Sequence, residues 1–140
     1  MKTKKTVIRP PNKKQQANSL KLLHKKTWNI FSKVIRKAKA NFRGYTKCYT
    51  CQKLFPWQEM HAGHWQHGRC DFEIWNIHPQ CVSCNRYKRG KLDVYTINLT
   101  DEYGPEMVKK LRQMANTHPG YTYSELKELH SKYLKLYESL

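Results

Sequence analysis

The sequence predicts a small α+β domain in which a β-hairpin and a short helix form the core, with one long helix before it and further helices after it. Two observations carry this prediction. Cysteines occur as two Cys-x-x-Cys pairs, Cys48/Cys51 and Cys81/Cys84, and a single tetrahedral metal site would draw the residues between them into one compact loop. The flanking segments repeat apolar residues with the period of amphipathic helices. At 140 residues, the chain fits one modest domain.

The first part of the chain is basic and divides into an arm and a helix. Residues 1–18 are polar, contain adjacent prolines and predict a flexible arm, which either contacts phosphate or is an ordinary unordered terminus. From Ser19, which is suited to be an N-cap, apolar residues recur at helical spacing as far as Gly44. Residues 19–44 therefore predict a long basic amphipathic helix. Its lysine-rich face fits either solvent or the DNA backbone.

Residues 45–91 carry the paired cysteines and predict the core of the domain. Residues 57–65 and 72–77 are expected to be the two strands of a hairpin, joined by a polar turn. Cys84 and Asn85 are then expected to open a short helix.

Residues 92–140 predict a helical C-terminal part. Helical spacing continues to Tyr103, Gly104-Pro105 marks a stop and a new start, and a second helix is expected over about 105–116. The sequence Thr122-x-x-Glu125 is a capping box that opens a last helix. Its apolar face could pack on the core and the long first helix, or against a second copy in a homodimer.

The charge balance predicts a polyanionic partner. The chain has 27 Lys and Arg against 10 Asp and Glu, a net charge of +17. No apolar run approaches the ~18 residues of a membrane-spanning helix, so nucleic acid is favoured over membrane. No secretory apolar segment follows the basic start, which predicts a cytoplasmic protein whose thiols stay reduced. Paired cysteines then indicate structural Zn²⁺, and Cys70 is expected to be a spare thiol.

The segment between the cysteine pairs contains residue types suited to phosphodiester hydrolysis. His64 is the candidate general base, because neutral imidazole can take a proton from water at physiological pH. Asn85 offers a carbonyl oxygen to a catalytic Mg²⁺ or Mn²⁺. Asn76 is expected to bond backbone across the hairpin and so orient His64. His78 is expected to pack under the zinc loop.

A strand, a turn, a strand and a helix that carry these residues resemble the HNH, or ββα-metal, endonuclease site. The segments 61-HAGH-64 and 76-NIHPQCVSCN-85, followed by Gly90, are similar to the signature of the phage NinG/Rap recombination nucleases. Tyr95, Leu99 and Gly104 extend the similarity beyond the site. The resemblance implies a metal-dependent DNA endonuclease that acts on branched recombination intermediates such as Holliday junctions or D-loops, in the cytoplasm of a bacterial host if the gene is a phage gene.

Two positions depart from the family pattern. His61 stands where the family has Asp, and Asp71-Phe72 stands where an Arg precedes the Phe. A nitrogen ligand at His61 would shift preference from Mg²⁺ towards Mn²⁺, Ni²⁺ or Zn²⁺. On a regular strand positions 61 and 64 face opposite sides, so Gly63 is expected to permit a bulge that brings both to one site. His61 is either a metal ligand or a hydrogen-bonding or exposed histidine.

The basic residues after the second cysteine pair are expected to contact DNA phosphate: Arg86, Lys88, Arg89 and Lys91. A solvated basic face is the alternative. For the whole chain, the alternative to a nuclease is a non-catalytic zinc-knuckle protein that binds DNA or RNA without cutting it. A sequence-reading restriction or homing enzyme is disfavoured, because no second specificity domain is evident.

Overall fold

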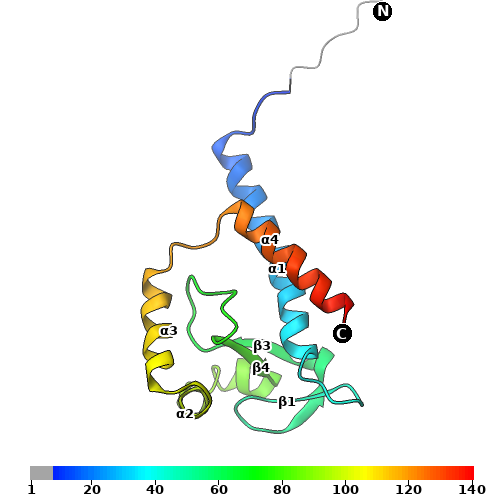
Figure 1. The fold of residues 1–140 in the computed structure, drawn as a ribbon, viewed down its shortest axis with the longest axis vertical. Helices are drawn as coiled ribbons and strands as arrows, with labels where there is room; N and C mark the ends of the chain where they lie inside the picture. The colour runs from blue at the N-terminus through cyan, green and yellow to red at the C-terminus, as the bar shows by residue number, and fades with distance from the viewer. Residues whose placement is uncertain (1–7) are drawn as a thin grey trace, which may run out of the picture.

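The computed structural model describes residues 8–140 and is a mixed α+β structure (Figure 1). In chain order its elements are α1 (Lys13–Lys37), β1 (Tyr45–Lys47), β2 (Leu54–Pro56), η1 (Trp57–Glu59), β3 (His61–His64), β4 (Ile77–Gln80), η2 (Ser83–Tyr87), α2 (Leu92–Tyr103), α3 (Pro105–Thr117) and α4 (Tyr123–Glu138). The two hairpins lie between a pair formed by α1 and α4 and a pair formed by α2 and α3 (Figure 1). Among the described residues, no helix has the length and apolar character needed to cross a membrane.

The long helix α1 begins earlier than the sequence predicted. Its N-cap is Asn12, whose side chain accepts from the Gln15 N–H while the Gln15 side chain accepts from the Asn12 N–H, both at 2.9 Å. This capping box satisfies two amide groups that a helix start leaves unpaired, so Ser19 lies inside the helix and is not its cap. Part of the predicted arm, residues 13–18, is therefore helical. Residues 1–7 of that arm lie outside the described residues.

The same helix also ends earlier than Gly44. After Lys37, the Asn41 side chain accepts from the N–H groups of Arg43 and Tyr45, each at 3.0 Å, and organises a turn that leads into β1. Phe42, which lies within the predicted helix and fits its apolar spacing, is 94% exposed. The apolar spacing thus continued by chance beyond the true end.

The last helix packs on the first within the same chain. Phe31 of α1 meets Tyr133 of α4 edge to face, with ring centroids 4.8 Å apart. Thr27 of α1 is fully buried and donates to the Leu126 carbonyl at 3.3 Å. The capping box of α4 forms as predicted, with the Glu125 N–H bonded to Thr122 Oγ1. Whether a second copy adds to this packing stays a prediction.

The central hairpin is shorter than expected and uses different residues. Strands β3 and β4 pair antiparallel, with His61 opposite Gln80 and His64 opposite Ile77. Of the predicted strands 57–65 and 72–77, residues 57–59 form a turn of 3₁₀ helix and residues 72–76 are irregular. Trp65 leaves the strand to pack in a second core with Tyr95, Leu99, Val108 and Leu111 of α2 and α3. Burial against these helices thus overrides the local strand preference of the aromatic residues.

Candidate functional site

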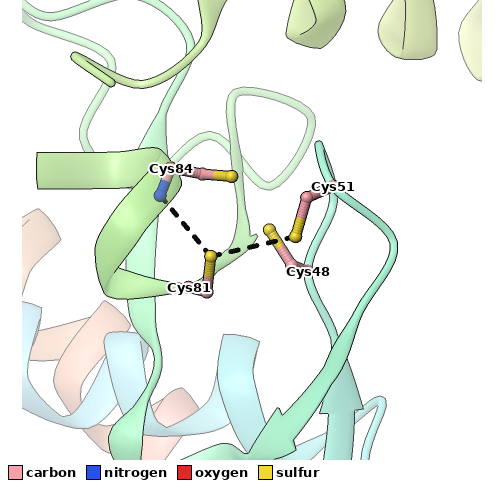
Figure 2. A group of neighbouring side chains, drawn as sticks. All are labelled: Cys48, Cys51, Cys81 and Cys84. Atoms are coloured by element: carbon pink, nitrogen blue, oxygen red, sulfur yellow. Dashed lines mark hydrogen bonds between the residues drawn. The ribbon is translucent and has the colours of Figure 1, made fainter. Parts of the chain in front are cut away.

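The four paired cysteines form a cluster that could bind a metal ion. The Sγ atoms of Cys48, Cys51, Cys81 and Cys84 all lie within 4.8 Å of one another and turn inward from the β1–β2 turn and the start of η2 (Figure 2). The Cys51 and Cys81 sulfurs are 3.9 Å apart, and none of the four forms a disulfide. A tetrahedron with Zn–S bonds of ~2.3 Å has sulfur–sulfur edges of about 3.8 Å. The donor set therefore fits structural Zn²⁺.

The thiols cannot all ionise together without a cation. Burial raises the pKa of Cys81 to about 12 and raises that of Cys51. Burial also opposes ionisation of Cys48, but hydrogen bonds from Thr50 and from nearby backbone amides outweigh it and lower the pKa to about 6. A divalent ion would remove this conflict, because metal coordination deprotonates every thiol ligand.

The strand that carries both candidate histidines is regular, and the predicted bulge at Gly63 is absent. Four consecutive pairs join β3 to β4 without interruption. Gly63 is instead required by close packing: a Cβ there would lie 2.0 Å from Gln80 Oε1. Alternation along β3 consequently places His61 on one face of the hairpin, and Ala62 and His64 on the other.

His61 meets Asn85 at the corner between the hairpin and η2. Asn85 Nδ2 donates to His61 Nδ1 at 2.9 Å, and both side chains are half-buried. The two residues line a cavity of about 440 Å³ that is also bordered by Trp28, Ser32 and Arg36 of α1. Residues 24 positions apart in the sequence thus offer an imidazole nitrogen and an amide group to one space.

Arg36 is a neighbour of this pair that sequence reasoning did not single out. Its Nη1 donates to the backbone carbonyls of Trp57, Gln58 and Met60 at 3.3–3.4 Å, and its Nε donates to Ser32 O at 3.0 Å. Burial lowers the pKa of Arg36, yet a guanidinium remains charged at physiological pH. These contacts hold a positive charge beside His61 and Asn85. An arginine in a helix shows no local signal of that placement.

His64 lies on the other face of the hairpin and pairs with Asp71. His64 Nε2 is 3.1 Å from one carboxylate oxygen of Asp71, and His24 Nε2 is 3.1 Å from the other oxygen. The His64 ring stacks on Trp28 with centroids 4.7 Å apart and planes 15° apart. Burial acts to raise the pKa of Asp71, but the hydrogen bond and charge of His64 and the charge of His24 outweigh it, so the pKa is lowered.

The candidate residues therefore fall into two neighbouring groups. His61 and Asn85 form one, and His64 and Asp71 form the other. Trp28 borders the cavities of both groups.

Asn76 bonds backbone across the hairpin, in the geometry expected for an orienting residue. Its Oδ1 accepts from Gln66 N–H, and its Nδ2 donates to Gln66 O, both at 2.9 Å. The Trp65 N–H also donates to the Asn76 carbonyl at 2.9 Å. These three bonds tie residues 65 and 66, which follow His64, to Asn76.

His78 is buried beside the loop that carries Cys48 and Cys51, as predicted. It stacks on Tyr49 with centroids 4.0 Å apart, and its two ring nitrogens lie 3.0–3.1 Å from the hydroxyls of Tyr95 and Tyr103. The Tyr95 hydroxyl also donates to Gly63 O at 2.8 Å. This network ties β3 and β4 to α2.

The basic segment after the cysteines is exposed. Arg86, Lys88 and Arg89 are exposed and Lys91 is half-buried. Arg89 and Lys91 have positive φ angles, 49° and 48°, which L residues rarely adopt. Over residues 8–140 the only ion pairs join His24 and His64 to Asp71, so no lysine or arginine there has a carboxylate partner. A polyanion would meet cations that the protein itself leaves unneutralised.

A family model confirms the resemblance to the NinG family. The model of the bacteriophage lambda NinG protein matches residues 2–140. The chain belongs to the NinG family. Protein ninG of Escherichia phage lambda is 33% identical over 90 residues, which cover 61% of this chain and 43% of that protein. Protein ninG of Escherichia phage 933W is also 33% identical over 90 residues, covering 61% and 44% respectively.

The match to the curated NinG relatives covers only part of their length. Protein ninG of Enterobacteria phage H19B is 40% identical over 47 residues, which cover 34% of this chain and 23% of that protein. The matched parts thus span less than half the length of these curated relatives. No solved structure matches the chain significantly.

Proposed function

We propose that this NinG-family protein is a metal-dependent DNA endonuclease with an HNH-type site, which hydrolyses phosphodiester bonds in branched recombination intermediates. The observation that carries the proposal is the 2.9 Å contact between His61 and Asn85, at the corner of a hairpin and a helical turn that the cysteine cluster holds together. The contact brings an imidazole and an amide to one cavity, and these are groups that could hold a catalytic cation.

The first part of the proposal concerns the catalytic cation. His61 and Asn85 would hold it, and the mixed nitrogen and oxygen donors favour Mn²⁺ over Mg²⁺ more than an all-oxygen set does. When bound, such an ion supplies a Lewis acid for the charge that develops on phosphate oxygens. Arg36 places a fixed positive charge in the same cavity, where it is suited to attract the scissile phosphate.

The second part concerns the general base. Asp71 accepts from His64 Nε2, which favours the tautomer that leaves Nδ1 unprotonated. In that tautomer His64 can take a proton from the attacking water. Because His64 and the His61/Asn85 pair lie on opposite faces of β3, the proposal requires the scissile phosphate to lie between the two groups, at Trp28, which borders both cavities. Stacking on Trp28 restricts rotation of the ring, and the Asn76 bonds restrain the backbone that follows it.

The third part concerns the substrate. Arg86, Lys88, Arg89 and Lys91 follow Asn85 directly and are proposed to draw the DNA backbone towards the hairpin. Such contacts position DNA without reading sequence, which suits recognition by shape. The proposed substrate places the reaction in the cytoplasm of a phage-infected bacterium.

Cleavage of a synthetic four-way junction in Mg²⁺ or Mn²⁺ tests the proposal. Wild-type protein should nick the junction, and His64→Ala should bind it with similar affinity while cutting about 10²–10⁴-fold more slowly. Asn85→Ala and His61→Ala should require higher cation concentrations for residual activity. His130→Ala, on α4, is the matched histidine control and should behave as wild type.

The competing function is a zinc-knuckle protein that binds nucleic acid without cutting it. It would be established if wild-type protein bound the junction tightly and left it intact in every divalent cation. It would also gain support if His61→Ala and His64→Ala cut as fast as wild type, since a contaminating nuclease would then be responsible.

A further inference from the structure

A second cavity lies on the His64 face of the hairpin. Apart from Trp28, which stacks on His64, and His24, which contacts Asp71, its outer wall has no part in the proposed hydrolysis. It encloses about 710 Å³ between α1 and the loop after β3. His64 and Asp71 border its inner end, and the outer wall comes from α1: Asn18, Lys21, Leu22, His24, Lys25 and Trp28. In Figure 1 the N-terminal end of α1 extends beyond the start of α4 and away from the hairpins. Its size is in the range of small-ligand sites.

The wall combines apolar surface with unneutralised positive charge. Leu22 is 64% exposed, and it lines the same cavity as Trp28, which packs partly buried against the core. Lys21 and Lys25 lie one helical turn apart, so their side chains share one face of α1. Neither lysine has a carboxylate partner among residues 8–140. A ligand with both an apolar planar part and a phosphate would complement these groups.

The single carboxylate in the cavity does not oppose such a ligand. Asp71 is engaged through both of its oxygens, one by His24 and one by His64, each at 3.1 Å. Its negative charge therefore faces two imidazoles. The His24 side chain is 38% exposed, which leaves part of its ring available for stacking.

We propose that this cavity receives an unpaired nucleotide of the DNA substrate, next to the bond that is cut. The inference rests on the proposed endonuclease function and names the structural feature of the substrate that the enzyme selects. The base contacts Leu22, Trp28 and the His24 ring, while Lys21 and Lys25 hold the adjacent phosphates. A base inside a continuous duplex is covered by its neighbours on both faces and cannot enter. D-loops supply unpaired bases, and unstacked branch points supply bases that lack a stacked neighbour on one face, so the cavity favours these branched forms over continuous DNA.

Fluorescence of 2-aminopurine tests the cavity without cleavage. The probe is placed at an unpaired position of a branched oligonucleotide, or at a paired position of a continuous duplex, with Ca²⁺ in place of Mg²⁺ or Mn²⁺. Wild-type protein should change the emission of the unpaired probe alone. Leu22→Asp should abolish the change and weaken binding of the branched DNA about tenfold, because it removes the base contact and adds a repelling carboxylate.

Ile97→Asp is the matched control, since Ile97 of α2 is a 60% exposed aliphatic residue far from the cavity in sequence. It should leave the signal unchanged. A Lys21→Gln, Lys25→Gln double variant should weaken binding of the branched DNA more than binding of the duplex, because these lysines hold the phosphates next to the bound base.

The proposal is overturned if Leu22→Asp keeps the emission change, or if the paired probe responds as the unpaired one does. Its failure is separable from failure of the proposed function. A wild-type protein that cuts junctions but shows no Leu22-dependent signal is an endonuclease without this pocket. A protein that shows the signal but never cuts is a binding protein with the pocket.

Discussion

Replacing Gly63 with Ala is expected to destabilise the hairpin that carries both candidate histidines. The added Cβ would lie 2.0 Å from Gln80 Oε1, 2.7 Å from Cδ and 3.0 Å from Cγ. Gln80 is fully buried and cannot swing into solvent. Its Nε2 donates to Gly90 O at 2.9 Å and to Thr50 Oγ1 at 3.2 Å. A shift of the side chain would break these two bonds, to the segment after η2 and to the loop between Cys48 and Cys51.

The size of the effect follows from these contacts. Losing two buried hydrogen bonds costs about 1 kcal/mol each, and overpacking adds about 1–3 kcal/mol. The free energy of unfolding should therefore fall by about 3–5 kcal/mol, and the melting temperature by on the order of 10 °C. Urea unfolding followed by tryptophan fluorescence, in saturating Zn²⁺, measures the change.

Two further variants separate the clash from other causes. A Cβ at Gly104 would meet no heavy atom within 4 Å, but the φ of 87° is unfavourable for alanine. Gly104→Ala should thus lose only about 1–2 kcal/mol. A Gly63→Ala, Gln80→Ala double variant should be as stable as Gln80→Ala alone, because the clashing atoms are gone. The close-packing account would be refuted if Gly63→Ala were as stable as wild type. It would also be refuted if the double variant lost the sum of the stabilities lost by Gly63→Ala and Gln80→Ala separately.

Three other predictions concern the metal cluster, the buried histidine and the candidate base. Chelation of zinc, or Cys48→Ser, should lower the melting temperature and expose tryptophan, because metal binding contributes folding free energy; a chelated protein with unchanged melting would exclude a structural ion. Burial lowers the pKa of His78 from 6.5 to about 3. As the pH falls below 6.5, His78 therefore takes up a proton in the unfolded chain but stays neutral in the folded chain, and this difference favours unfolding. Stability should drop by about 2 kcal/mol between pH 7 and pH 5, and a His78→Gln variant, with the same cysteines, should show a correspondingly smaller drop in urea titrations at the two pH values. Asp71→Asn should slow junction cleavage about 10–100-fold and alter its pH profile without weakening DNA binding, whereas Glu73→Gln should change neither; equal rates for wild type and Asp71→Asn would remove Asp71 from the mechanism.

Local signals predicted the helices well where a complete signature was recognised. The Thr122 and Glu125 capping box placed the start of α4 correctly. The start of α1 was missed because the equivalent Asn12 and Gln15 pair follows two prolines, in a stretch whose composition suggested an unfolded arm. Both caps are contacts between residues three positions apart, so both were within reach of the sequence.

The hairpin was harder to predict because its limits depend on distant elements. Trp65 and Trp75 favour strands by composition, but Trp65 is buried against α2 and α3 and its Nε1 donates to Thr96. The true return strand, Ile77–Gln80, includes a proline and a fully buried glutamine. Gln80 fits there only because Gly63, which pairs with His78 two residues before it on the same face of the hairpin, leaves room for the side chain.

The sequence by itself determined the cysteine cluster, the basic charge and the membership of the NinG family, because residue type and spacing alone carry these properties. Tertiary structure decided which side chains meet. It joined His61 to Asn85, placed Arg36 of α1 beside them, and turned His64 to the opposite face with Asp71. These contacts depend on strand register and on how α1 packs across the hairpin, and such packing is set by the whole core and not by any local run of residues.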